Sequence, residues 1–194
     1  MQTIQNIAED VQAVITSYNQ GEMVREAVDS LCNQTMLPSK IIIVDDGSTD
    51  EASIQILKEI QSDSEIPIPV CIVRQENSGV SAARNAGIRR TETAMVLVFD
   101  GDDRLEPEYI EKVRECMQKD PFMIAASSWM HTFGILESVS MNRLYGWESE
   151  ICNTLTQDQK LSDASDESMK SPSYGDGGMA AAVRIATMQK KILE

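Results

Sequence analysis

The sequence predicts a layered α/β domain built on a mostly parallel central sheet. Short apolar runs of strand length alternate with amphipathic segments of helical period up to residue 126. Such alternation is typical of parallel strands joined by helical crossovers. In addition, the run Ile41–Val44 is apolar at every position, as expected for a central strand that is covered on both faces.

Several short segments have the composition of strands. Val96–Phe99 combines β-branched and aromatic residues, which are enriched in strands. Pro67 and Pro69 frame a strand at 70–73. Proline cannot donate a hydrogen bond to a neighbouring strand, so this one is expected near an edge of the sheet. In chain order, we expect strands at 13–16, 41–44, 70–73, 96–99 and 123–126.

Each expected helix carries its own local signal. The first has apolar residues at the i, i+3, i+4, i+7 spacing of one buried face. Thr49 and Asp50 are good N-cap residues for the second. The third is rich in small residues and can pack closely on a neighbour, and Pro107 suits the first turn of the fourth. The helices are therefore expected over 22–33, from 49 or 50 to about 62, over 80–89, and from 107 to about 120.

The composition changes after Trp147. Residues 148–174 are polar, which predicts loops, whereas 179–193 regain helical character with lysines near the end that suit the helix dipole. We therefore expect three parts. Residues 1–10 form an N-terminal extension, 11–130 form the α/β part, and 131–194 complete the same domain with loops and a C-terminal helix.

The formal charge of −14 disfavours binding to nucleic acid or to anionic lipid. A phosphate ligand would need local arginines or a metal ion. The apolar runs are far shorter than the ~20 residues of a transmembrane helix, and residues 1–10 do not resemble a signal peptide. The four cysteines are widely spaced and form no CxxC pair, which favours reduced thiols. Together these features predict a cytoplasmic protein.

The strand at 96–99 runs directly into an acidic stretch that contains Asp100, Asp102 and Asp103. Carboxylates one residue apart can share a hard cation such as Mg²⁺ or Mn²⁺, although Asp and Gly are also common in simple turns. Parallel strands place their carboxyl ends at one edge of a sheet, where open α/β sheets bind ligands. We therefore expect Thr16 and Asp46, which end two other strands, to lie near these acids.

Four long stretches point to a family. They are VITSYNQGEMVREAVDSLCNQT, KIIIVDDGSTD, RQENSGVSAARNAGI and LVFDGDDRLEPEYI. In this order and spacing they closely resemble family 2 glycosyltransferases of the GT-A fold, over roughly residues 11–130. The resemblance implies a GT-A, Rossmann-like domain. It also implies transfer of a sugar from a nucleotide-diphosphate sugar, expected to be a UDP-sugar, to an acceptor hydroxyl in polysaccharide or glycoconjugate assembly.

The resemblance assigns roles to residues of the donor site. Thr16, Tyr18 and Asp46 look like the family's uracil-binding group, and Arg84 would reach the base or the phosphates. Asp100 is expected to bind the ribose. These residues are drawn from three expected strand ends and from the small-residue helix. Asp45 is instead expected to order its loop.

The same resemblance implies a Mn²⁺ or Mg²⁺ cofactor. Asp102 is expected to bind this ion, which would bridge the diphosphate oxygens and stabilise the leaving nucleotide during catalysis. Asp103 could join the metal shell or the donor sugar.

The acceptor side is matched only loosely. Many family members carry Glu-Asp-Trp where this chain has Gly175-Asp176-Gly177. Asp176 is therefore the candidate catalytic base that accepts the proton of the acceptor hydroxyl, and direct displacement would invert the anomeric configuration. His131, the only histidine, is more typical of packing or of the surface than of a base. A saccharide or lipid-linked saccharide is expected as acceptor, and a lipid-linked one would allow peripheral membrane association.

Two other interpretations remain open from the sequence. The polar composition of residues 148–178 is compatible with a non-catalytic or truncated nucleotide-sugar-binding module. A nucleotidyltransferase-like enzyme could use a similar acid pair. It would need a basic phosphate-binding loop near the N-terminus, and residues 16–21 contain no basic residue.

Overall fold

The computed structural model describes residues 6–120, 123, 125–126, 130–132, 138–140 and 186–189. The chain divides into two compact units, residues 1–127 with 183–194, and residues 128–182. The described part of the second unit is an antiparallel pair of strands, β8 (Met130–Thr132) and β9 (Ser138–Ser140). All other elements belong to the first unit.

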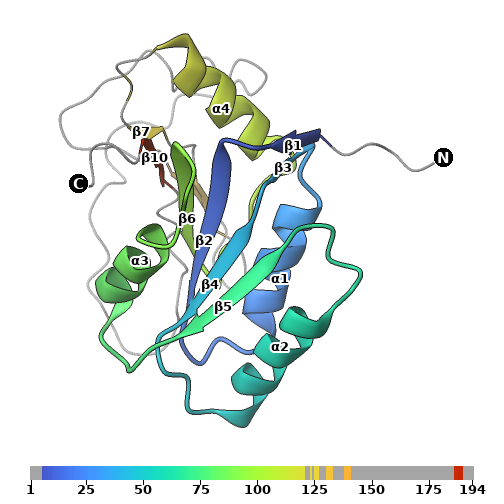
Figure 1. Ribbon diagram of the computed structural model, residues 1–194, viewed down its shortest axis with the longest axis vertical. Coiled ribbons are helices and arrows are strands. Elements are labelled where there is room, and N and C mark those ends of the chain that lie inside the picture. The colour runs from blue at the N-terminus through green and yellow to red at the C-terminus, as the bar shows by residue number, and fades with distance from the viewer. Residues whose placement is uncertain are drawn as a thin grey trace. The chain divides into compact units, whose positions relative to one another are not determined.

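The first unit is organised around a six-stranded sheet with the order β5-β4-β2-β6-β10-β7 (Figure 1). Its strands are parallel except β10, which is antiparallel to both of its neighbours. The prediction of a mostly parallel sheet with the 70–73 strand at its edge is confirmed. The strands are β2 (Val11–Ser17), β4 (Ile41–Asp45), β5 (Val70–Arg74), β6 (Met95–Asp100), β7 (Ala125–Ala126) and β10 (Ala186–Gln189).

Helices cover both faces of this sheet. Figure 1 shows α3 on one side of the strands, with α1 and α2 next to each other on the opposite side. The second helix begins as predicted, because the Asp50 carboxylate accepts a hydrogen bond of 2.7 Å from the Ser53 amide. The described residues contain the helices α1 (Glu22–Cys32), α2 (Glu51–Ser62), α3 (Val80–Ile88) and α4 (Tyr109–Lys119).

The small residues of α3 allow the close packing that the sequence predicted. Ala83, Ala86 and Gly87 are buried against the sheet. A Cβ atom on Gly87 would overlap the Cγ1 atom of Val14 and lie 3.2 Å from Cγ2 of Val44. Any larger residue at this position would push α3 away from β2 and β4.

The expectation of a C-terminal helix needs correction. Residues 186–189 form strand β10 between β6 and β7, within the segment predicted to be the C-terminal helix. The backbone of β6 would otherwise present unpaired groups on that side, and pairing with β10 satisfies them, overriding the local helical pattern. Within the expected N-terminal extension, β1 (Asn6–Ala8) pairs in parallel with β3 (Met36–Pro38), a strand that the sequence did not predict.

The contact at Gly87 leads to a stability prediction. Substitution Gly87→Val should lower the free energy of unfolding by about 1–3 kcal/mol, because the new side chain overpacks the interface with Val14. Urea denaturation measures the change. Ser81→Val, at an exposed position of the same helix, is the control and should change stability by less than about 0.5 kcal/mol. Equal losses in the two variants would show that valine in the helix, and not the interface, is responsible.

Candidate active site

The carboxyl ends of β2, β4 and β6 meet at one edge of the sheet, as predicted. Thr16 of β2 is the register partner of Asp100 on β6, and Ser17 is the partner of Asp45 on β4. The amide of Gly101 donates to the carbonyl oxygen of Thr16 over 2.8 Å, which continues the ladder one residue beyond β6. This pairing places the acidic stretch directly beside the end of β2.

Asp100 is held by two neighbours. The hydroxyl of Thr16 donates to its Oδ1 atom over 2.7 Å. From α3, Arg84 donates through Nη2 to both carboxylate oxygens, at 2.8 and 2.6 Å, and through Nε to Oδ1 at 3.2 Å. The two side chains are about one quarter exposed, at 26% for Arg84 and 23% for Asp100. Such charge-assisted bonds are stronger than bonds between neutral groups, so α3 is tied to the end of β6.

Asp46 is buried and ties the end of β4 to the start of α3. Its carboxylate accepts hydrogen bonds from the backbone amides of Ser78 and Gly79, at 3.0 and 2.8 Å, and from the side chain of Gln75 at 2.7 Å. These amides immediately precede α3, the helix that carries Arg84. Asp46 therefore orders the segment that leads into this helix, and its expected contact with a nucleotide base stays a prediction.

The loop after β2 is fixed to the loop after β4. Asn19, at a positive φ of 51°, accepts the amide hydrogens of Thr49 and Asp50 through its side-chain oxygen, at 2.8 and 3.3 Å. Asp45 orders the second loop as expected, since its Oδ1 accepts the amide of Ser48 at 2.9 Å. Tyr18, which directly precedes Asn19, is 45% exposed. Its ring is therefore available to stack on a flat ligand.

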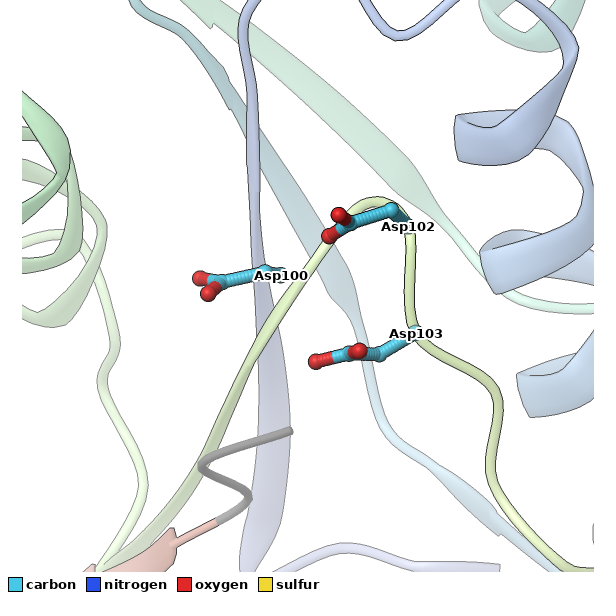
Figure 2. A group of neighbouring side chains, drawn as sticks. All are labelled: Asp100, Asp102 and Asp103. Carbon is cyan, nitrogen blue, oxygen red and sulfur yellow. The ribbon is translucent and has the colours of Figure 1, made fainter. Parts of the chain in front are cut away.

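The three acids of the stretch 100–103 form one cluster. One ligand oxygen from each of Asp100, Asp102 and Asp103 lies within 4.8 Å of the other two, and Figure 2 shows the three carboxylates extending to the same side of the chain. Burial raises the pKa of Asp102, and Asp100 raises it further. Burial, together with the charges of the other two acids, raises the pKa of Asp103 to about 7.

This cluster fits a divalent cation. Oxygen ligands from carboxylates are what Mg²⁺ and Mn²⁺ prefer. Among the described residues, both carboxylate oxygens of Asp103 are buried without a hydrogen-bond partner, which is unfavourable for a polar group unless a further ligand compensates. When all three carboxylates are ionised, they carry three negative charges, and Arg84 offsets one of them. The remaining two match the charge of one such ion.

Two glutamines support the acidic stretch, and neither was singled out from the sequence. The side chain of Gln20 packs against Gly101, where an added Cβ atom would overlap its Oε1 atom, and it opposes the rise in the pKa of Asp102. The buried amide of Gln34, just after α1, donates to the Glu106 carbonyl at 2.8 Å and accepts from the Ile110 amide at 3.1 Å. Gln34 thereby fixes the segment between the acids and α4. The only signal in the sequence was a glutamine that directly follows the helix expected over 22–33.

The structure brings together the predicted residues Thr16, Arg84, Asp100 and Asp102. Asp176, the predicted base, lies outside the described residues. His131 lies on β8, where only the backbone is described. Their expected roles therefore stay predictions.

A mixed α/β domain with an acidic cluster at the carboxyl edge of a parallel sheet is the architecture of a GT-A-type protein. The family described as Glycosyl transferase family 2 matches residues 12–173, and the chain belongs to this family. The glycosyltransferase GlyA of Streptococcus pneumoniae is 36% identical over 105 residues, covering 54% of this chain and 14% of GlyA.

Solved structures agree with this fold. The mannosyltransferase PcManGT of Pyrobaculum calidifontis, solved with GDP-Man and Mn²⁺, superimposes with a TM-score of 0.52 at 18% identity, covering 66% of this chain and 39% of that one. TarS of S. aureus gives 0.50 at 22% identity, covering 65% of this chain and 22% of that one. This chain thus matches well under half the length of these relatives. Within the part that the structure describes, no helix is long and apolar enough to cross a bilayer.

The bonds to Asp100 predict energetic coupling between its two partners. Thr16 and Arg84 donate to the same Oδ1 atom, so losing one should change the effect of losing the other. In a double-mutant cycle of Thr16→Val and Arg84→Gln, urea unfolding should give a coupling energy of about 0.5–3 kcal/mol.

A second cycle serves as the control for this coupling. It pairs Thr16→Val with Arg25→Gln, because Arg25 forms its ion pairs with Asp29 and Asp63 and not with Asp100. This pair should be additive within about 0.5 kcal/mol. Additivity in both cycles would contradict the shared role of Asp100.

Proposed function

We propose that this chain binds a nucleotide-diphosphate sugar, expected to be a UDP-sugar, together with Mn²⁺ or Mg²⁺, and transfers the sugar to an acceptor hydroxyl with inversion. The observation that carries this proposal is the cluster of Asp100, Asp102 and Asp103 at the end of β6, beside Arg84. Membership in glycosyl transferase family 2 supports the reaction class. A saccharide or lipid-linked saccharide is the proposed acceptor, in polysaccharide or glycoconjugate assembly.

The nucleoside would occupy the ends of β2 and β4. The exposed ring of Tyr18 offers a stacking surface for a base. The Asp46 carboxylate, which uses three hydrogen bonds within the protein, has room for about one more among its four lone-pair sites. The imide N–H of uracil is a donor of the required kind. Asp100 would accept from the ribose hydroxyls.

The diphosphate would lie near the acidic cluster, where a metal ion is needed because carboxylates and phosphates repel each other. Asp102 is the proposed ligand of this ion, because the resemblance to the family assigns it that role. When bound, the ion would stabilise the negative charge that develops on the leaving nucleotide. PcManGT, which was solved with GDP-Man and Mn²⁺, gives a precedent for such a pairing in a protein of this fold.

The proposed base is Asp176. The register of strand β10 is compatible with this assignment, because β10 begins at Ala186, the partner of Val98, two residues before Asp100. Since β10 is antiparallel to β6, the chain enters it at the edge that carries the acidic cluster. Asp176 precedes Ala186 by ten residues, so the backbone limits it to about 33–36 Å from that point. A carboxylate there could accept the proton of the attacking hydroxyl.

Donor binding should depend on the metal. Isothermal titration calorimetry of UDP in the presence of Mn²⁺ should show binding that EDTA removes and that Asp102→Asn weakens by at least about tenfold, because the ion links carboxylate to diphosphate. The control is Glu106→Gln, an exposed acid of the same segment, which should bind UDP as the wild type does. Unchanged UDP affinity in EDTA would exclude the metal from donor binding.

The role of Asp176 can be separated from donor binding. Asp176→Asn should reduce sugar transfer by at least about 10²-fold, the usual contribution of a positioned base, while the dissociation constant for UDP stays within about twofold. Transfer is measured with a panel of UDP-sugars and acceptors, and Asp166→Asn is the matched control. Retained turnover would exclude Asp176 as the base. Donor binding by the wild type without transfer to any acceptor would favour the binding-module interpretation instead.

A further inference from the structure

Val80, the first residue of α3, is exposed although it belongs to the face of the helix that packs on the sheet. Val80, Ala83 and Gly87 follow the i, i+3, i+7 spacing of one helix face. Ala83 and Gly87 are buried, and Gly87 lies close to β2 and β4. Val80, in contrast, is 48% exposed. The exposure of an apolar side chain on this face requires an explanation.

The direction of α3 supplies the explanation. The two amides that precede the helix bind the carboxylate of Asp46, which directly follows β4. The helix therefore begins at the carboxyl edge of the sheet and runs back over β2 and β4 to the close contacts of Gly87. Val80 precedes Gly87 by about two helical turns. Its side chain is exposed because it extends beyond the ends of the strands, at the edge that carries the site.

Val80 lies between two carboxylates of this edge. Gly79, the residue before it, donates its amide to Asp46 over 2.8 Å. Arg84, four residues later, lies one turn along the same side of the helix and binds both carboxylate oxygens of Asp100. The valine side chain therefore stands over the part of the site between Asp46 and Asp100.

A second exposed apolar side chain reaches Asp46 from another element. The amide of Asp46 donates to the carbonyl oxygen of Ser17 over 2.9 Å, and Tyr18 is the next residue. Tyr18 and Val80 thus each follow a residue that is hydrogen-bonded to Asp46. Both belong to the exposed large apolar side chains of the part that the structure describes. A buried carboxylate is therefore flanked by two exposed apolar groups, one following β2 and one on α3.

This combination selects the kind of ligand. Phosphate oxygens and sugar hydroxyls are polar and gain little from a valine. A nucleobase has two apolar faces and a polar edge. One face can stack on the ring of Tyr18, the other can contact the methyl groups of Val80, and an N–H on the edge can reach Asp46. Small-molecule sites commonly combine apolar walls with a few polar groups that fix the orientation of the ligand.

We propose that Val80 is a further donor-binding residue, whose methyl groups pack against the face of the nucleobase opposite Tyr18. This inference rests on the proposed function, because it adds a contact to the proposed nucleoside site. It gives α3 two tasks, since Arg84 holds Asp100 one turn further along the helix. The resemblance to the family assigned no role to Val80.

The test compares UDP with inorganic pyrophosphate, which has the diphosphate but no base. Isothermal titration calorimetry of the full chain with Mn²⁺ measures both dissociation constants. Val80→Ala should raise the constant for UDP about fourfold or more, the effect of about one buried methylene group. The constant for pyrophosphate should stay within about twofold. Val80→Ile keeps the apolar contact and should bind UDP as the wild type does.

The matched control is Ile7→Ala, which shortens an apolar side chain of similar exposure, 49%, on β1. Strand β1 shortly precedes β2 and lies at its amino end, away from the site. Both dissociation constants should therefore remain those of the wild type in this variant.

Three results with Val80 variants would overturn the inference. They are unchanged UDP affinity in Val80→Ala, an equal loss of UDP and pyrophosphate affinity in that variant, or an equal loss of UDP affinity in Val80→Ile. The second result would show that the substitution disturbs the start of α3 and not a contact with the base. In each case the wild type still binds UDP, so the proposed function stands. Failure of the wild type to bind UDP would refute the proposed function, and this inference with it.

Discussion

Three carboxylates lie within 4.8 Å of one another at the end of a buried strand, and their mutual repulsion is the constraint that the surrounding structure must meet. Arg84 offsets part of this repulsion, because its guanidinium forms a partly buried ion pair with Asp100 at 2.6 Å. An ion pair in such a place attracts more strongly than one in water. Since Arg84 belongs to α3, the charge balance of the site depends on the position of this helix.

Two contacts determine the position of α3. Gly87 lets the helix approach β2 closely, and Asp46 binds the two amides that precede the helix. On the other side of the cluster, Gln34 fixes the chain that leads from the acids to α4. The acidic stretch is therefore held between two helices by groups that do not belong to it. This arrangement fixes the chain on both sides of the carboxylates.

The sequence was sufficient for the sheet but not for all of its partners. Alternation of apolar runs and helical periods predicted β2, β4, β5 and β6, and it predicted that the carboxyl ends of β2, β4 and β6 meet, because the topology follows from the pattern itself. Strand β10 was predicted as helix, since its pairing with β6 depends on a neighbour about ninety residues away. The bonds of Gln34 have the same origin, as Glu106 and Ile110 are more than seventy residues distant. Local patterns carry no information about such partners.

The structure also changes the interpretation of Arg84. The sequence resemblance implied that Arg84 reaches the base or the phosphates, whereas the guanidinium donates through Nε and Nη2 to Asp100. An arginine has five N–H donors, and the two on Nη1 are not used by Asp100. Arg84 can thus hold Asp100 and still offer donors to a ligand. The two roles are compatible because they use different nitrogens of one planar group, so a donor that reaches Nη1 would bind to a side chain already fixed in position.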